Sequence, residues 1–439
     1  MDGRIEKVVE GLVADFHGRS LPALTPRELQ LPLIPGKADA VIGMRRSGKT
    51  YFLFQQLRQL EKHGIPRERA LYINFEDERL LPIEASQLGL FPEALYRRYP
   101  ENRDQRCWFF FDEIQNVPGW ERFVRRLMDT ESAQVVVSGS SAKLLGKEIA
   151  TSLRGRSLTT EILPFSFREY LAHAEIPIPT RWPPPAKVRS RLERALEDYL
   201  EVGGFPEVQS LPAELRTRTH QDYVDVAVLR DVVERHQISN TSALRQVLRQ
   251  FLHAPGRLFS VHKMFNDLKS QGLRVGKDAI HAFVQHLEDA FVLFTMEVDS
   301  HSARVRTSRP RKCYLIDPGL ARSFRYRSAG DRGWLLENTV YLELRRRGYS
   351  AKYVVTKSGF EVDFIARRAP NDTVLVQVCS EFDDDATRQR EVRALEEALA
   401  EKRAKDAVIV TTHHADALKI GRRQVPVVPA WTWLVRASW

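Results

Sequence analysis

Residues 38–50 read ADAVIGMRRSGKT, an apolar run followed by a loop that ends in Gly48, Lys49 and Thr50. Residues 43–50 fit the pattern G-x-x-x-x-G-K-[ST], and residues 51–63 follow with leucines at helical spacing. Such a loop between a strand and a helix can surround a phosphate with its N–H groups, because its glycines allow positive φ. We expect residues of this loop to bind ATP, namely Gly43, Arg46, Ser47, Gly48, Lys49 and Thr50.

The second motif of the site is FFFDE, residues 109–113, an apolar run that ends in two carboxylates. In this arrangement Lys49 would reach the β- and γ-phosphates, and Thr50 and Asp112 would hold Mg²⁺. Glu113 would polarise the attacking water. The alternative is that the two acids only cap the next segment. Two motifs about 60 residues apart, in this order, predict one site for ATP and Mg²⁺.

The first part of the chain alternates between predicted strands and helices. Residues 70–75, 107–112 and 134–139 are unbroken apolar runs, and a helical pattern covers about 120–129. Continuous apolar strands are typical of a parallel sheet covered on both faces. The sequence therefore predicts an α/β fold with a parallel sheet.

Length and composition limit the class of protein. The 439 residues correspond to about three domains, and a hydrophobic content of 43% excludes disordered and collagen-like chains. The net charge of +10 permits a nucleic-acid or anionic-membrane partner without requiring one. The excess of arginine over lysine suits phosphate contacts but equally reflects genome composition.

The cysteines and the apolar runs indicate a cytoplasmic protein. Cys107, Cys313 and Cys379 are far apart, so neither a zinc site nor a disulfide framework is expected. The first residues, MDGRIEKVVEGL, lack the apolar core of a signal peptide, and no run approaches the ~18 apolar residues of a membrane span. We expect no membrane partner.

Downstream of the sheet, the pattern changes twice. Residues 165–237 read as helices, and residues 241–300 hold three short helical patterns followed by the strand-like FVLFTMEV, a combination typical of a winged helix. A mixed α/β pattern returns after about residue 334. The predicted domains are an ATPase core (1–164), a helical lid (165–237), a winged-helix module (238–332) and a C-terminal α/β domain (333–439).

Hydroxyl and arginine side chains follow the third apolar run. The segment QVVVSGSS carries Ser138, Ser140 and Ser141, and we expect Ser140 to hold the attacking water, with helix capping as the alternative. The next segment, SLRGRS, carries Arg154 and Arg156. Arg156 is our candidate for an arginine that reaches the phosphates of a neighbouring subunit. The alternative is a surface or nucleic-acid-facing arginine.

The motifs GMRRSGKT, FFFDEIQNVPGW, SGSSAKLL, SLRGRS, LPFSFREYL and GGFPE together resemble the AAA-type ATPases of bacteria and archaea that carry a C-terminal domain of uncertain function. The resemblance covers essentially the whole chain. It implies a P-loop core of the ASCE class with a parallel sheet, a helical lid, a winged-helix module and a restriction-endonuclease-like end. It also implies self-association into a ring in which an arginine acts between subunits.

The middle of the chain carries a predicted DNA-binding surface. Apolar residues lie on one face of the last helical pattern, which leaves Lys277, His281 and Gln285 outward, as in a recognition helix. Residues 301–332 hold nine basic residues against two acids, an excess typical of contact with a phosphate backbone. Alternatives are a protein-packing module and a solvated charged face. The expected contacts to duplex or branched DNA are Lys277, His281, Arg304, Arg306, Arg309, Arg311 and Lys312.

The tail LLENTVYLELRRRGY, KSGFEVDFIAR and VLVQVCSE resembles the PD-(D/E)XK nuclease fold. The resemblance places Glu337 and Asp363 at two acidic positions, and Glu361 lies on the same strand face as Asp363. It places Gln377 at the second strand acid and Cys379 at the lysine. A neutral amide binds a hard cation poorly, and a buried thiol is a poor base. We therefore expect a degenerate nuclease site. The alternative is that another lysine, such as Lys357, moves into the position of the missing one.

Together these patterns predict an ATP-hydrolysing, DNA-binding oligomer that remodels duplex or branched DNA. Three other functions remain open. The chain could be an ATP-gated DNA-binding regulator or defence switch, an ATP-dependent DNA nuclease, or a scaffold for a protein partner. The substitutions at Gln377 and Cys379 weigh against the nuclease.

Overall fold

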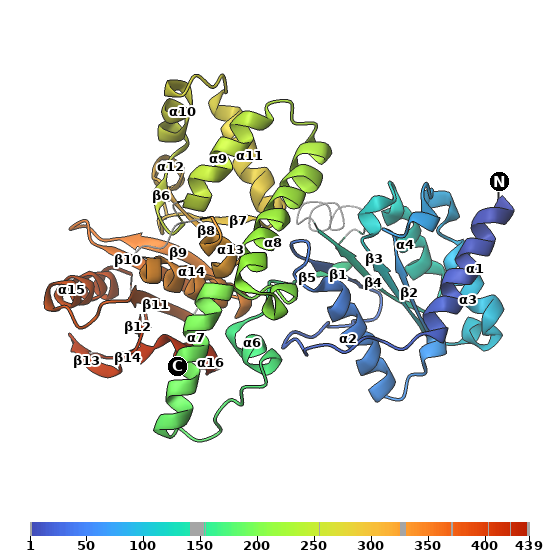
Figure 1. Cartoon of the computed structure of the whole chain (residues 1–439), viewed down its shortest axis with the longest axis horizontal. Coiled ribbons are helices and arrows are strands. Elements are labelled where there is room, and N and C mark those ends of the chain that lie inside the picture. Colours follow the sequence, from blue (N-terminus) through green and yellow to red (C-terminus); the bar gives the residue numbers. More distant parts are fainter. Residues whose placement is uncertain are drawn as a thin grey trace. The chain divides into compact units, whose positions relative to one another are not determined.

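The computed structural model describes residues 2–140, 153, 155–253, 255–324, 331–369, 372–402, 404–421 and 423–436. The chain divides into two compact units, Met1–Leu163 and Pro164–Trp439 (Figure 1). The finer division of the second unit into three domains stays a prediction.

The first unit is built on a five-stranded parallel sheet with the order β2-β3-β4-β1-β5. Its strands are β1 (Ala38–Ile42), β2 (Ala70–Asn74), β3 (Cys107–Asp112), β4 (Ala133–Gly139) and β5 (Ser157–Glu161). Its helices are α1 (Asp2–Gly18), α2 (Lys49–Lys62), α3 (Leu90–Arg98) and α4 (Trp120–Thr130). Helices α2 and α4 both contact β4, and Figure 1 shows them on different sides of the strands.

The apolar strands are buried because both faces of this sheet are covered. The consecutive side chains of Phe109, Phe110 and Phe111 are all fully buried, although alternate side chains of a strand point to opposite faces. This confirms the predicted parallel sheet. Strand β5 was not predicted, because it lies at the sheet edge and its sequence SLTTE is polar and only half-buried.

The second unit begins with helices α6 (Phe167–His173), α7 (Ala186–Val202) and α8 (Ala213–Val226), and α8 continues into a π-helix, η8 (Ala227–Glu234). The loop after α7 is fixed by the buried carboxylate of Asp317. Gly204 N–H donates to Asp317 Oδ2 over 2.6 Å, and Leu320 N–H donates to Oδ1 over 2.8 Å. A Cβ on Gly319 would lie 2.1 Å from the Val202 carbonyl oxygen. The GGFPE segment therefore packs directly on residues 317–320.

Three helices and a small antiparallel sheet follow. The helices are α9 (Thr241–His253), α10 (Val261–Ser270) and α11 (Lys277–Asp289). The strands β6 (Leu258–Phe259), β7 (Leu293–Met296) and β8 (Arg311–Leu315) pair in the order β6-β8-β7. The short helices α12 (Ala303–Ser308) and α13 (Pro318–Arg322) precede and follow β8. The apolar face predicted for α11, with Ile280, Phe283 and Leu287, is buried.

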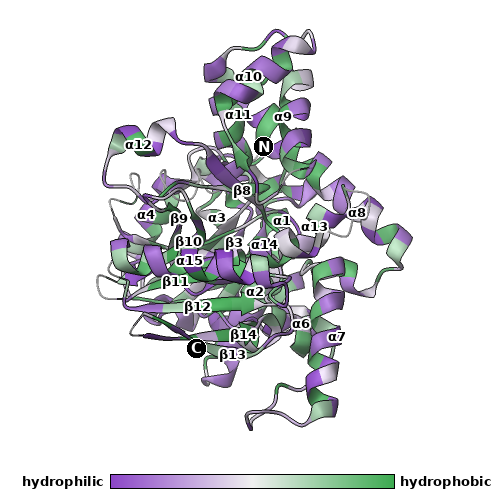
Figure 2. Cartoon of the chain, turned by 90° about the vertical axis from the view of Figure 1, so that its left-hand side faces the viewer, coloured by the Kyte–Doolittle hydropathy of each residue, from purple (hydrophilic) through white to green (hydrophobic). Residues whose placement is uncertain are grey.

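The C-terminal part is a six-stranded mixed sheet with the order β13-β14-β12-β11-β10-β9. Its strands are β9 (Ser350–Val355), β10 (Glu361–Ala369), β11 (Asp372–Cys379), β12 (Asp406–Thr411), β13 (Asp416–Ile420) and β14 (Arg423–Pro429). Its helices are α14 (Asp331–Arg346), α15 (Asp385–Lys402) and α16 (Ala430–Val435). Strand β12 is mainly hydrophobic, and the visible side of α15 is mostly hydrophilic (Figure 2). This α/β arrangement confirms the predicted fold class.

No helix within the described ranges is both long enough and apolar enough to cross a lipid bilayer.

Candidate functional site

The phosphate loop, residues 43–50, joins β1 to the start of α2. Gly48 lies directly before the helix in the left-handed region with φ 100°, and Arg46 is also left-handed with φ 66°. A Cβ on Gly43 would lie 2.2 Å from the Ile162 carbonyl oxygen, so only glycine fits there. The loop thus has the irregular backbone that directs N–H groups toward a bound phosphate.

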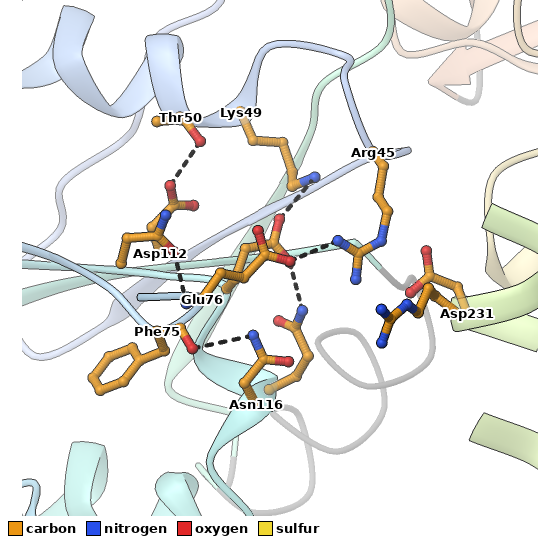
Figure 3. Close-up of polar contacts among 12 residues, drawn as sticks. Arg45, Lys49, Thr50, Phe75, Glu76, Asp112, Asn116 and Asp231 are labelled. Atoms are coloured by element: carbon orange, nitrogen blue, oxygen red, sulfur yellow. Dashed lines mark hydrogen bonds and ion pairs between the residues drawn. The ribbon is translucent and has the colours of Figure 1, made fainter. Parts of the chain in front are cut away.

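Lys49 crosses this loop and reaches the acidic motif. Its side chain is 4% exposed, and Nζ lies 3.2 Å from Glu113 Oε1. The same ammonium donates to the carbonyl oxygens of Gly43 and Met44 over 3.1 and 3.3 Å. Lys49 and Glu113 therefore form a buried ion pair at the carboxyl ends of β1 and β3. Figure 3 shows Lys49 beside the hydrogen-bonded pair Thr50 and Asp112.

Asp112 is the centre of a hydrogen-bond network that joins three strands and a helix. Its Oδ2 accepts from Thr50 Oγ1 over 2.7 Å and from the Tyr72 hydroxyl over 2.8 Å. Its Oδ1 accepts from Ser138 Oγ, whose oxygen also accepts the Glu113 N–H over 3.1 Å. The carboxylate is fully buried. Thr50 and Asp112 thus lie together as the sequence predicted.

The two acids differ in their electrostatics. Burial and the neighbouring charge of Glu113 raise the pKa of Asp112 above its ordinary value, although three hydroxyl donors oppose the shift. Burial alone would raise the pKa of Glu113, but the charge of Lys49 and the hydrogen bond from Gln115 lower it below its ordinary value. Gln115 Nε2 donates to Glu113 Oε2 over 2.5 Å. Glu113 is therefore held as an anion, the form that polarises a water.

Among the three serines of the segment QVVVSGSS, Ser138 has hydrogen bonds to both members of the acidic pair, to Asp112 Oδ1 and to the Glu113 N–H. The predicted residue, Ser140, is buried at the end of β4 and follows Ser138 on that segment. Ser141 and Arg154 lie outside the described residues. Sequence reasoning missed Tyr72 because a tyrosine within an apolar run reads as core. It also missed the ion pair between Arg45 and Glu76, in which Nη1 and Oε1 are 2.6 Å apart.

Arg156 is not brought to the phosphate loop of its own chain. Its carbonyl oxygen accepts the Ala38 N–H over 2.9 Å, and β5 then runs parallel to β1. Arg156 therefore lies where β1 begins, at the amino ends of the strands, whereas the phosphate loop follows the carboxyl end of β1. Its guanidinium, which is 38% exposed, pairs with Asp129 Oδ1 at 2.6 Å.

These residues fit ATP with Mg²⁺. The hydroxyl of Thr50 and the carboxylate of Asp112 are oxygen donors, the class that Mg²⁺ prefers, and they are already within hydrogen-bond distance. Arg46 and Gly48 supply backbone N–H groups at the start of α2, Ser47 supplies a buried hydroxyl, and Lys49 supplies a positive charge.

The predicted DNA contacts divide into exposed and paired groups. Lys277 and His281 are exposed on α11, and Arg304 and Arg309 are exposed near α12. Arg306 and Arg311 lie 4.0 and 3.2 Å from the carboxylate of Glu297, so their charge is partly neutralised. Arg325 and Arg327 lie outside the described residues.

The prediction for Lys312 is wrong as a DNA contact. Its side chain is only 4% exposed, and its Nζ lies 2.9 Å from Glu337 Oε1, 2.7 Å from Glu361 Oε1 and 3.0 Å from Asp363 Oδ1. A count of charges along the chain cannot tell which face of β8 a lysine occupies. The Lys312 ammonium therefore lies among three acids, which we call the carboxylate cluster: Glu337, Glu361 and Asp363. The sequence pattern placed this lysine on a DNA-binding surface instead.

The charges of the carboxylate cluster shift one another. Burial and the charge of Asp363 raise the pKa of Glu337 to about 7. Burial alone would lower the pKa of Lys312, but the three carboxylates raise it well above its ordinary value. The ammonium is thus held in its charged form.

Gln377 and Cys379 both lie on β11, next to the strand that carries Asp363. Gln377 Oε1 accepts the Asp363 N–H over 3.2 Å, and Nε2 donates to Glu391 Oε2 over 2.6 Å. Cys379 is buried, which raises the pKa of its thiol to about 11. Lys357 is exposed in the turn before β10. Glu391, on α15, is an acid near Gln377 that the sequence pattern did not single out.

Three family models match the chain. Residues 36–171 match a family described as "AAA domain", residues 193–330 a domain of unknown function, and residues 335–423 "Restriction endonuclease". An uncharacterized protein of Methanocaldococcus jannaschii is 35% identical over 93% of this chain and 90% of its own length. An uncharacterized protein of Haemophilus influenzae is 31% identical over 79% of this chain and 83% of its own length.

Solved structures resemble the chain more distantly. The Orc1 protein of Aeropyrum pernix in complex with DNA is 15% identical, with coverage of 74% of this chain and 91% of that chain and a TM-score of 0.29. Cdc6p from Pyrobaculum aerophilum is 13% identical, with coverage of 63% of this chain and 84% of that chain and a TM-score of 0.24. We draw nothing on function from these likenesses.

The first test concerns Ser138. In Ser138→Ala, Asp112 loses a donor and the Glu113 N–H loses its acceptor, so both acids lose support. We expect ATP turnover to fall by ~10- to 100-fold, in line with hydrogen bonds to charged groups, with ATP affinity changed by less than about threefold. Ser157→Ala, at the other end of the sheet, is the control for turnover and calorimetric binding. Wild-type turnover in Ser138→Ala would show that this hydroxyl does not support the acids.

Proposed function

Because the chain belongs to a family that joins an AAA domain to a C-terminal restriction-endonuclease domain, we propose that it hydrolyses ATP with Mg²⁺ at the phosphate loop. The observation that carries the proposal is the Asp112 network. It links the Thr50 hydroxyl to the acid beside Glu113, as a metal-dependent phosphoryl-transfer site requires.

Each side chain then has one role. The N–H groups of Gly48 and its neighbours, with Lys49, bind and orient the phosphates, and Thr50 and Asp112 hold the metal. Bound Mg²⁺ would supply positive charge to the transferring phosphoryl group. Glu113, kept anionic, accepts a hydrogen bond from the attacking water and orients it.

The test of this site separates binding from turnover. Lys49→Ala removes the cation that neutralises the phosphates, so we expect nucleotide affinity to fall by at least ~10-fold. Glu113→Gln keeps the shape but lacks the anion, so it should bind ATP and lose turnover by ~10²- to 10⁴-fold. Lys62→Ala, exposed at the end of α2, is the matched control in calorimetry and phosphate release. Wild-type turnover in Glu113→Gln would remove Glu113 as the water-polarising residue.

We further propose that residues 238–332 form a winged helix that binds duplex or branched DNA. Support comes from the three helices with a three-stranded sheet, and from the exposed cations on α11 and around α12. Helix α11 exposes Lys277, His281 and Gln285 on the side opposite its buried face. Such a helix fits the major groove, and Arg304 and Arg309 fit phosphate contacts.

The DNA proposal predicts a defined salt dependence. Arg304→Ala/Arg309→Ala removes two exposed cations, so the slope of log affinity against log salt should fall by about two and affinity by ~10-fold at 0.1 M salt. Lys419→Ala, exposed on β13, is the control. Fluorescence anisotropy on duplex and four-way-junction DNA measures both quantities. A wild-type slope near zero would contradict the proposal.

We propose that the chain self-associates into a ring in which Arg156 completes a neighbour's site. Arg156 lies at the amino ends of the strands, away from the phosphate loop of its own chain, and this position supports action in trans. In this scheme DNA remodelling follows ATP-driven movement, and an ATP-gated switch is the alternative. Strand displacement would favour remodelling, and a sequence-defined footprint without displacement would favour the switch.

Three buried free thiols suit the cytoplasm in which we place the protein.

Mixing two inactive variants tests the ring. Arg156→Ala should lose ~10³-fold in turnover, because an arginine on the transferring phosphate contributes about that much. Mixed with Lys49→Ala, which keeps its arginine, it should regain activity, since some interfaces then combine an intact loop with an intact arginine. Arg122→Ala, exposed on α4, is the control. Unchanged turnover in Arg156→Ala, or no recovery on mixing while sedimentation shows oligomers, would contradict the assignment.

A further inference from the structure

The carboxylate cluster already contains a cation. The Lys312 ammonium lies 2.9, 2.7 and 3.0 Å from one oxygen each of Glu337, Glu361 and Asp363. An ammonium has three N–H donors, so three carboxylate acceptors use all of them. The side chain is 4% exposed, and its carboxylate partners are 16%, 36% and 12% exposed. The ion cluster is therefore mostly removed from water, where such attractions are strong.

The acids come from elements that a nuclease-like fold uses to hold a divalent metal. Glu337 lies on α14, and Glu361 and Asp363 lie on β10. Lys312 comes from β8, which belongs to a different sheet in the same compact unit. The oxygens that would converge on a metal converge on an ammonium instead.

Further hydrogen bonds hold the cluster in place, one of them on an oxygen that Lys312 already contacts, Glu337 Oε1. Asp363 Oδ2 accepts the Val378 N–H over 2.9 Å, and Glu337 Oε1 accepts the Tyr314 hydroxyl over 2.7 Å. The Gln377 amide is held between the Asp363 N–H and Glu391.

We propose that the Lys312 ammonium is a tethered cation that occupies the metal position of the carboxylate cluster, so that this site binds no divalent cation in the native protein. The ammonium also fixes β8 to α14 and β10. This inference goes beyond the proposed ATPase and DNA-binding functions and does not depend on them. It gives a physical reason for a nuclease-like domain that does not cut.

The competing role for Lys312 is that of a catalytic lysine. A lysine that assists an attacking water needs an N–H free for that water. All three donors of Lys312 are used by carboxylates here. The contacts therefore favour a structural cation over a catalytic one, and metal-dependent cleavage becomes an outcome of the test.

The experiment uses nucleotide-free, full-length protein and Mn²⁺ as the probe. Calorimetric titration of wild type and Asp363→Asn should give the same Mn²⁺ stoichiometry, because the wild-type cluster takes up none. Lys312→Met leaves three carboxylates without a counter-ion, so we expect its melting temperature without metal to fall by about 5–15 °C. It should then bind one additional Mn²⁺, which restores at least half of the lost melting temperature.

Matched variants isolate the effect. Lys352→Met, a partly exposed lysine on β9, should change neither the melting temperature nor Mn²⁺ uptake. Lys312→Met/Asp363→Asn should lose the gained Mn²⁺ site. Any binding at Asp112 is common to all of these proteins and cancels in the comparison.

Three results would overturn the proposal. The first is a wild-type Mn²⁺ site that Asp363→Asn removes. The second is Mn²⁺-dependent cleavage of plasmid DNA by wild type that Lys312→Met abolishes. The third is a folded Lys312→Met that takes up no additional Mn²⁺. If Lys312→Met does not fold, the comparison of wild type with Asp363→Asn still decides the outcome.

Discussion

The buried carboxylate of Asp112 is the constraint on which the first unit depends. A carboxylate removed from water is unfavourable unless donors surround it. Here the donors come from α2, β2 and β4, as Thr50, Tyr72 and Ser138. Each strand must therefore end at the same level of the sheet, and the phosphate loop must begin α2 there. The same contacts that satisfy Asp112 place Lys49 against Glu113, so one set of contacts determines both the fold of the first unit and the geometry of the nucleotide site.

Buried charges play the corresponding part in the second unit. Asp317 accepts N–H groups from residues more than one hundred positions apart in the chain, Gly204 and Leu320. Lys312 ties β8 to α14 and β10. Both contacts cross boundaries at which the sequence pattern suggested separate domains, and they belong to the single compact unit Pro164–Trp439. Removing one partner of such a buried charge strongly destabilises the folded protein, because the remaining charge stays buried and unpaired.

The sequence predicted features that depend on neighbouring residues. The phosphate loop, the apolar strands and the pair Asp112–Glu113 follow from local spacing, and the structure places them together. It did not predict β5 or β13, because edge strands are short and polar and carry no apolar run. The contacts of Ser138 were not predicted, since alternation alone does not determine which hydroxyl of the segment meets a carboxylate. Lys312 was misplaced because its partners lie 25 to 51 residues further along the chain.

The substitutions in the nuclease-like part are electrostatically connected. Three carboxylates that face one another repel, so a cluster that loses its metal needs another cation or must lose acids. The resemblance to the PD-(D/E)XK fold expects an acid and a lysine where β11 carries Gln377 and Cys379, and Lys312 supplies a positive charge from β8. A cation attached to the chain cannot dissociate, so the acids stay neutralised whatever the metal concentration. In the proposed arrangement the ion cluster therefore has a packing role, because it holds β8, α14 and β10 together.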